Sequence, residues 1–171
     1  MRRFLRSAVA FAALACIAPA TALELPKRKS GLWEIRTTSA NEPPGPSAQL
    51  CIDEKTDDLA RQLAMGALSC SKMDIRQEGE RYVADSVCRI GDSTATTRVL
   101  FSGTFDTGYK ADIQARYSPP LMGMSEGRTT VHATWVGPCR AGQRPGDIVM
   151  PNGMVINLND APSGLIPKPS K

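Results

Sequence analysis

The alternation of side chains from Tyr109 to Tyr117 constrains the fold more than any other feature of this sequence. Its odd-numbered positions are apolar or aromatic, whereas its even-numbered positions are the polar residues Lys110, Asp112, Gln114 and Arg116. A period of two places successive side chains on opposite faces of a β-strand. The segment is therefore predicted to be a strand with one buried and one solvated face, as in antiparallel sheets.

The same alternation recurs in several other segments, which favours a mainly β fold. The other predicted strands are Leu32–Thr38, Ala48–Ile52, Ser71–Gln77, Arg81–Ile90, Thr94–Phe105 and Glu126–Val136. One short helix is predicted over Asp57–Met65, with Thr56 as its N-cap and Gly66 at its end. Because one short helix cannot cover the apolar face of such a sheet, we expect a curled antiparallel sheet or partial barrel of about six or seven strands.

The first 22 residues have the pattern of a secretory signal peptide. A basic start, Met1 to Arg6, precedes an apolar run from Ser7 to Ala18, and Ala20-Thr21-Ala22 matches a small-x-small cleavage site. The apolar run is about a dozen residues long, which is too short to cross a bilayer that needs roughly 20. We expect a signal peptide cleaved after Ala22 and a periplasmic or secreted product.

Two other readings of this leader remain open. Ala13-Leu14-Ala15-Cys16 loosely resembles a lipoprotein box, although the apolar run continues past Cys16 without a polar tether. Arg2-Arg3 suggests twin-arginine export, but the usual spacer residue before Phe4 is missing. The missing polar tether and the missing spacer residue both favour simple cleavage of the leader.

The rest of the chain is expected to be one domain. Residues 23–160 are predicted to form a single β-rich domain, and 161–171, which are rich in proline, are predicted to be disordered. No later apolar run reaches the length of a membrane span.

The basic charge of the chain comes mostly from the leader. The whole sequence has 21 Lys and Arg against 17 Asp and Glu, and the leader contains three of the arginines and no acidic residue. The remaining net charge is about +1. Nucleic-acid binding requires a basic patch that persists in the folded domain, so this class of partner is not expected.

Four cysteines remain after the leader, and they predict two disulfide bonds. Cys51, Cys70, Cys88 and Cys139 include no Cys-x-x-Cys pair, and the chain has one histidine, so a metal site built from cysteines is not expected. Cys88 and Cys139 share the strand parity of apolar neighbours, whereas Cys51 and Cys70 do not. Parity therefore predicts the pairs Cys51–Cys70 and Cys88–Cys139.

Several short motifs in fixed order resemble a known family. They are Gly31-Leu32-Trp33-Glu34, Gln49-Leu50-Cys51-Ile52, Cys70, Gly79 before Cys88, and Trp135-Val136-Gly137-Pro138-Cys139. The chain resembles a widespread bacterial group of small exported proteins known as domain of unknown function 3617, from about Lys29 to Asp147. The resemblance implies an envelope location and a β-rich fold. It implies no activity and provides no catalytic residues.

No arrangement of residues in the sequence indicates catalysis. His132 is the one histidine, and its parity is opposite to that of Val131, Ala133 and Trp135, so it is expected to face solvent rather than to act as a base. The cysteines are assigned to disulfides, which leaves no thiol nucleophile. We expect a non-enzyme without a cofactor.

Three binding hypotheses remain. The first is a binding module in which a small hydrophobic ligand lies between the sheet and the predicted helix. The second is an accessory role in which a sheet edge or the proline-rich tail contacts an envelope protein. The alternative is copper handling by Met122 and Met124, in a loop predicted from Ser118 to Met124, together with His132, because thioether and imidazole ligands suit Cu(I).

Overall fold

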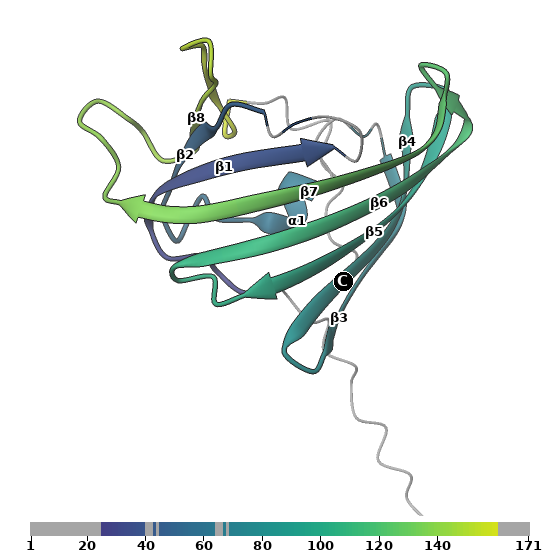
Figure 1. Cartoon of the computed structure of the whole chain (residues 1–171), viewed down its shortest axis with the longest axis horizontal. Coiled ribbons are helices and arrows are strands. Elements are labelled where there is room, and N and C mark those ends of the chain that lie inside the picture. Colours follow the sequence, from purple (N-terminus) through teal and green to yellow (C-terminus); the bar gives the residue numbers. More distant parts are fainter. Residues whose placement is uncertain (1–24, 40–42, 44, 64–66, 68, 161–171) are drawn as a thin grey trace, which may run out of the picture.

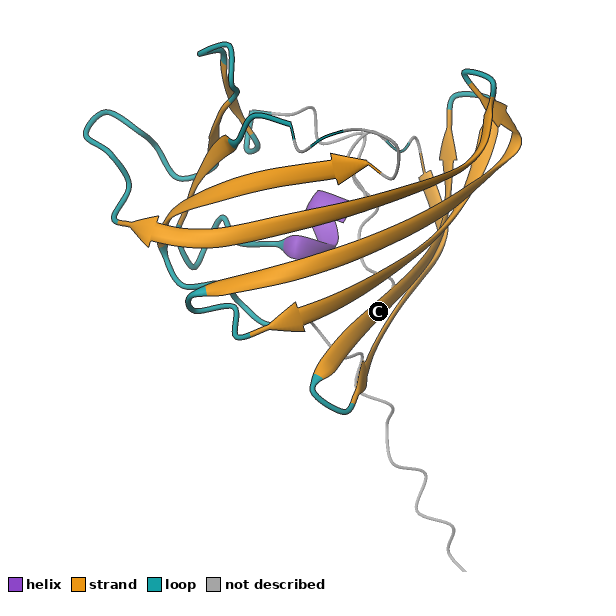
Figure 2. Ribbon diagram, in the orientation of Figure 1, coloured by secondary structure: helices purple, strands orange, loops and turns teal. Residues whose placement is uncertain are grey.

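The computed structural model describes residues 25–39, 43, 45–63, 67 and 69–160. Most of this part of the chain is β-strand (Figure 2). The strands are β1 (Gly31–Ser39), β2 (Ala48–Ile52), β3 (Ser69–Glu78), β4 (Arg81–Ile90), β5 (Ser93–Gly103), β6 (Gly108–Leu121), β7 (Met124–Gly137), β8 (Asp147–Val149) and β9 (Val155–Asn157), and the helix is α1 (Leu59–Leu63). The predicted signal peptide, 1–22, and the predicted disordered tail, 161–171, lie outside the described residues.

The nine strands form one antiparallel sheet in the order β3-β4-β5-β6-β7-β1-β2-β8-β9. β3 to β7 form a meander, and β1 pairs with both β7 and β2. The sheet curls around α1 without closing, because β3 and β9 are its two edges (Figure 1). The predicted fold class is thus confirmed, with nine strands instead of six or seven.

The two additional strands, β8 and β9, lie in the segment after Arg140. Each is three residues long, and β8 extends the sheet by pairing with β2. Leu158, which follows β9, is buried in the hydrophobic core. This C-terminal hairpin therefore belongs to the domain.

The hydrophobic core lies on the concave face of the sheet, where α1 covers it (Figure 1). Tyr109 and Ala111 of β6 are buried, as the alternation predicted, whereas Tyr117 at the far end of the same strand is half-buried. Trp33 of β1 is fully buried, and Leu59 of α1 packs in the same cluster. The helix end of the concave face is therefore filled by the protein's own side chains.

Phe105 joins this core from a turn instead of from a strand. β5 ends at Gly103, and Phe105 has a φ of 59°, a left-handed conformation that is uncommon for a bulky residue. Its ring stacks on Tyr109, with centroids 5.3 Å apart and an interplanar angle of 13°. Burial of this ring against the core offsets the backbone cost of the turn.

The helix is shorter at its start than the sequence predicted. It begins at Leu59 because Asp58 is the capping residue: its carboxylate accepts a hydrogen bond of 2.8 Å from the Arg61 N–H. Thr56, the predicted cap, instead accepts a hydrogen bond from the Asp53 N–H within the preceding turn. The predicted end, Met65–Gly66, lies outside the described residues.

The β6–β7 hairpin extends through the predicted loop at 118–124. Leu121 pairs with Met124, which leaves a two-residue turn of Met122 and Gly123. Both residues have positive φ, 50° and 82°, the combination that defines a type I′ turn. Asparagine is preferred at the first of these positions, so Met122 occupies a conformation that is unfavourable for its side chain.

Replacement of this methionine with the residue that the turn prefers is expected to stabilise the protein. The Met122→Asn variant should raise the free energy of unfolding by about 1 kcal/mol, because asparagine tolerates the left-handed region. Urea unfolding of both proteins measures the difference. An unchanged or lowered midpoint would contradict the assignment of the turn.

The disulfide between Cys70 and Cys88 shows that the predicted pair Cys51–Cys70 is wrong. Cys70 lies opposite Cys88 in the β3–β4 ladder, with Cα atoms 3.9 Å apart. The ladder shifts register at Ser71, which is an extra residue on β3. This bulge turns Cys70 onto the face of Ile75, whereas unbroken alternation would have placed it on the opposite face.

The second disulfide joins Cys51 to Cys139, so the predicted pair Cys88–Cys139 is also wrong. Leu32 of β1 is the register partner of Cys51 on one side and of Gly137 on the other. The β1–β7 ladder shifts register directly after Leu32, which reverses the parity of the end of β7. Cys139 therefore lies on the Leu32 side of the sheet, away from the face that carries Cys88.

The longer disulfide loop is expected to contribute more stability. The cysteines are 88 positions apart in Cys51–Cys139 and 18 apart in Cys70–Cys88. In the chain-entropy treatment these loops correspond to about 4.5 and about 3 kcal/mol. Urea unfolding of the two double Cys→Ala variants tests the order, and a larger loss from the Cys70–Cys88 variant would contradict it.

Candidate functional site

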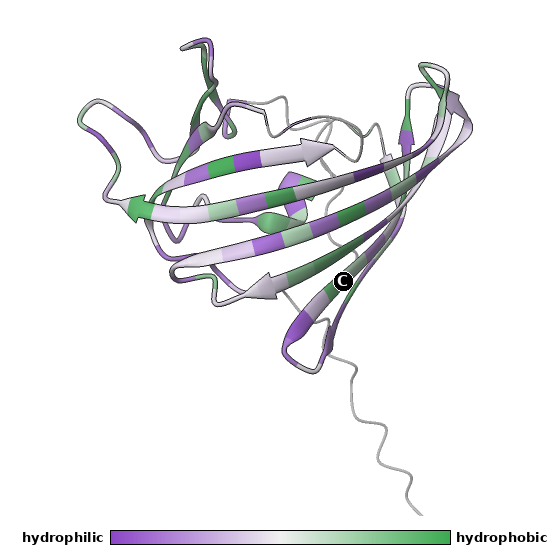
Figure 3. Cartoon of the chain, in the orientation of Figure 1, coloured by the Kyte–Doolittle hydropathy of each residue, from purple (hydrophilic) through white to green (hydrophobic). Residues whose placement is uncertain are grey.

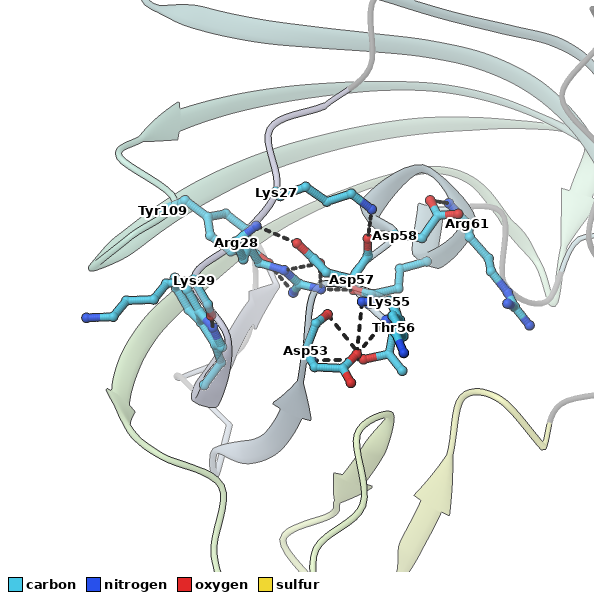
Figure 4. Close-up of polar contacts among 12 residues, drawn as sticks. Lys27, Arg28, Lys29, Asp53, Lys55, Thr56, Asp57, Asp58, Arg61 and Tyr109 are labelled. Carbon is cyan, nitrogen blue, oxygen red and sulfur yellow. Dashed lines mark hydrogen bonds and ion pairs between the residues drawn. The ribbon is translucent and has the colours of Figure 1, made fainter.

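A buried ion pair between Arg28 and Asp57 lies on the concave side of the sheet (Figure 4). The side chains are 0% and 1% exposed, and an Arg28 terminal nitrogen lies 2.6 Å from Asp57 Oδ1. Arg28 Nε donates a second hydrogen bond of 2.8 Å to the same oxygen, and the Arg28 backbone N–H donates to Oδ2. The carboxylate thus accepts from both the side chain and the backbone of one residue.

Further polar groups complete this cluster. Arg28 donates to the Tyr109 hydroxyl at 3.2 Å and to Gln62 Oε1 at 3.1 Å, and Lys27 Nζ donates to the Asp57 carbonyl. Burial raises the pKa of Tyr109, and the Arg28 charge opposes that shift only in part. The Tyr109 phenol is therefore a neutral member of the cluster at physiological pH.

The side chains of Arg28, Asp57, Gln62 and Tyr109 hold separate parts of the chain together, and we call this group the clamp. It joins the segment before β1, the turn before α1, and β6, and its two charges are shielded from solvent. The buried Gln62 Nε2 has no hydrogen-bond partner in the part of the chain that the structure describes. The charged atoms are already paired with one another, so the cluster offers no free charge to a ligand.

Removal of one partner of this ion pair is expected to be costly. The Arg28→Met variant should lower the free energy of unfolding by roughly 3–5 kcal/mol, because it leaves a buried carboxylate without its cation. The double variant Arg28→Met/Asp57→Asn removes both charges and should recover much of the loss. Urea unfolding of the wild type, both single variants and the double variant gives the coupling energy, and additive effects would contradict a clamp.

The structure does not bring the predicted copper ligands together. Met122 and Met124 lie at the tip of the β6–β7 hairpin, and both are exposed. His132 lies eight positions further along β7, about 26 Å from Met124 for an extended strand. As predicted, His132 is exposed on the convex face, where its register partners are Arg36 and Lys110.

No group of three or more His, Cys, Asp or Glu side chains that could hold a metal ion occurs within the described ranges. The four cysteines all take part in disulfides, which agrees with their predicted role although not with their predicted pairing. None of the described helices is long and apolar enough to cross a membrane.

A shallow groove of about 490 Å³, lined by both polar and apolar groups, lies across the convex face of the central strands. The alternating positions of β5, β6, β7 and β1 that face away from the core supply most of its walls. Register aligns Arg98 with Gln114 and Gln114 with Arg128, so that three side chains form one row across β5, β6 and β7. The groove is lined by Thr38, Ser39, Arg98, Leu100, Asp112, Ile113, Gln114, Arg128, Thr129 and Thr130.

The two arginines flank the groove and have free hydrogen-bonding capacity. Within the described part of the chain, the ion pairs of Arg98 are distant, at 3.9 Å from Glu78 and 3.9 Å from Asp85. Arg128 is exposed and has no ion pair among the described residues. Because one strand separates β5 from β7, the two backbones are about 10 Å apart, with Gln114 between them.

The acidic residue of the groove is neutralised by its own neighbours. Asp112 accepts a hydrogen bond of 2.9 Å from the Thr130 hydroxyl and pairs with Lys110 Nζ at 2.9 Å. The Lys110 hydrogen bond, more than the one from Thr130, holds the pKa of the Asp112 carboxyl below its usual value. The groove therefore presents two guanidinium groups, an amide and hydroxyl groups to solvent, a set that suits a carboxylate or phosphate.

Some of the residues that line this groove could be predicted from the sequence to face solvent. The polar positions of the alternating segment at 109–117 include Asp112 and Gln114, so their solvent-facing position could be predicted. Their neighbours Arg98 and Arg128 could not be found without the register of three strands. For the buried cluster, the sequence predicts Asp57 only as the first residue of a helix, and no pattern in the sequence pairs it with Arg28.

Comparison with known proteins identifies a family. The family described as "Protein of unknown function (DUF3617)" matches residues 28–139, about two thirds of the 171-residue sequence. No curated protein and no solved structure matches the chain. The matched segment begins at the buried Arg28 and ends at Cys139, so it contains the clamp, both disulfides and the convex groove. The chain belongs to this family of proteins of unknown function, DUF3617.

Proposed function

We propose that this chain is a non-catalytic binding module of the cell envelope that holds a small anionic ligand in its convex groove. The observation that carries the proposal is the row formed by Arg98, Gln114 and Arg128 across three paired strands. Strands of a continuous sheet fix the spacing of these groups, which lowers the entropy that is lost when a ligand binds.

The size and chemistry of the groove support a small polar ligand. Its volume of about 490 Å³ lies in the usual range for small-molecule sites, roughly 300–1,000 Å³. A carboxylate or phosphate group can accept hydrogen bonds from two guanidinium groups at once. The concave face is where a hydrophobic ligand would bind, but core side chains and Leu59 of α1 fill its helix end, so the groove favours a polar ligand.

Two observations support the proposed location. The leader has the order of charges and apolar residues found in signal peptides. The two disulfides require an oxidising compartment, such as the periplasm or the extracellular space. Mass spectrometry of the protein recovered from the periplasm tests both points, because cleavage after Ala22 gives a product that begins at Leu23.

Titration with defined anions tests the binding proposal. Citrate and inorganic phosphate are added to ¹⁵N-labelled protein, and amide chemical shifts are followed by NMR. We expect saturable shifts at Gln114 and Thr130, with affinity that falls as salt rises because the contacts are ionic. Arg128→Gln should weaken binding at least fivefold.

The matched control is Arg81→Gln. Arg81 is also exposed and has no ion pair in the described part of the chain, but it lies at the start of β4, outside the groove. Citrate affinity should be unchanged in this variant. Shifts that are absent from the groove, or an equal loss of affinity in both variants, would reject the proposal.

A further inference from the structure

Two hairpin tips of the domain expose large apolar side chains to solvent. We infer that the β6–β7 and β8–β9 hairpins together dock the domain on the surface of an anionic phospholipid membrane. This surface is separate from the convex groove. Its occupant is a lipid bilayer, and the inference rests on the exposure, charge and placement of the two tips.

The β6–β7 tip holds methionine where the fold does not favour it. Met122 is 91% exposed and Met124 is 54% exposed. Met122 also occupies the first position of a type I′ turn, which asparagine or glycine would fill at lower backbone cost. Neither core packing nor turn geometry therefore explains an apolar side chain at this position.

The β8–β9 hairpin exposes a second apolar group. Met154, Val155 and Ile156 are consecutive and are 50%, 56% and 46% exposed. They lie on or beside β9, which is an edge strand of the sheet. Exposed large apolar residues gathered at an edge indicate an interaction surface more often than isolated ones do.

The tip of each hairpin lacks charged side chains. Residues 117–125 and 148–158 contain no Asp, Glu, Lys or Arg, although 22% of the whole sequence is charged. Twenty residues of average composition would contain about four charges. Insertion of these tips into a headgroup region therefore requires no buried charge, which is the main cost of membrane contact.

The two tips project from the same side of the molecule. In Figure 1 the β8–β9 hairpin and the β6–β7 hairpin both reach the top of the view, above the body of the sheet. Figure 3 shows hydrophobic residues in both hairpins. A flat surface laid across that side would touch both tips at once, and a membrane is such a surface.

The charge beside the tips complements an anionic membrane. The loop at 138–146 contains Arg140 and Arg144 and no acidic residue, and it extends on the same side of the molecule (Figure 1). Arg140 is exposed and has no ion pair among the residues that the structure describes, while Arg144, whose side chain is 67% exposed, pairs with Asp160 at 3.2 Å and with Asp147 at 3.7 Å. The unpaired charge of Arg140 beside the apolar tips attracts the domain to negatively charged headgroups.

Vesicle flotation tests the inference. The purified protein, with its N-terminus defined by mass spectrometry, is floated with vesicles of phosphatidylethanolamine and phosphatidylglycerol and, separately, of phosphatidylcholine alone. We expect binding to the anionic vesicles that is at least fivefold stronger than to phosphatidylcholine and that decreases at high salt. Equal binding to both compositions, or none, would overturn the inference.

Variants locate the contact. Met122→Asn/Met124→Ser and Val155→Thr/Ile156→Thr should each reduce flotation at least fivefold. Val136→Thr is the matched control, because Val136 is 51% exposed at the end of β7, away from both tips, and it should float like the wild type. Thermal unfolding confirms that each variant is folded, and Met122→Asn places the preferred residue in the turn.

Three further outcomes would overturn the inference. Loss of flotation in Val136→Thr equal to that in the tip variants would show nonspecific adsorption. A concentration-dependent dimer that the Val155→Thr/Ile156→Thr variant abolishes, without flotation of the wild type, would assign the β9 edge to a second copy of the chain. Retained flotation of both tip variants would place the lipid contact elsewhere.

Discussion

The ion pair between Arg28 and Asp57 determines how the concave face of the sheet is closed. The segment before β1 and the turn before α1 have few apolar residues, so packing alone gives them little reason to lie against the sheet. One guanidinium group reaches the carboxylate, Gln62 and the Tyr109 hydroxyl of β6, and therefore joins three separate parts of the chain. Each polar atom of a buried charged group needs a hydrogen-bond partner at a defined position. This cluster therefore fixes the position of the helix more specifically than a hydrophobic contact would.

Much of the sheet could be predicted from alternation, because the central strands bury one face and expose the other. β4 has the predicted bounds, Arg81–Ile90, and β2 has the predicted bounds, Ala48–Ile52. Alternation failed where bulges interrupt it. The extra residue at Ser71 and the register shift after Leu32 each reverse a face, and these two irregularities account for both errors in disulfide pairing. β8 and β9 are three residues long, which is too short for a period of two to be recognised.

The candidate groove could be predicted only in part, because it is a property of register. Along one strand, Gln114 is simply a polar residue between two apolar ones. Beside Arg98 and Arg128 it becomes the centre of a charged row, and those neighbours are 16 and 14 positions away in the sequence. The same reasoning explains why the predicted copper ligands Met122, Met124 and His132 do not meet. They are close in sequence, but an extended strand holds apart residues that a helix would bring together.

The two disulfides are nested, since the loop closed by Cys70 and Cys88 lies inside the loop closed by Cys51 and Cys139. A chain that enters an oxidising compartment from its N-terminus presents Cys51 and Cys70 first, and these two are not partners. An oxidant that joins cysteines in order of appearance would close the wrong loop. The native arrangement requires Cys51 to wait for Cys139, the last cysteine to arrive, or to be released later by thiol–disulfide exchange. For a chain oxidised in this order, oxidation faster than folding would trap Cys51 with Cys70, and thiol–disulfide exchange would then be needed to reach the native pairs.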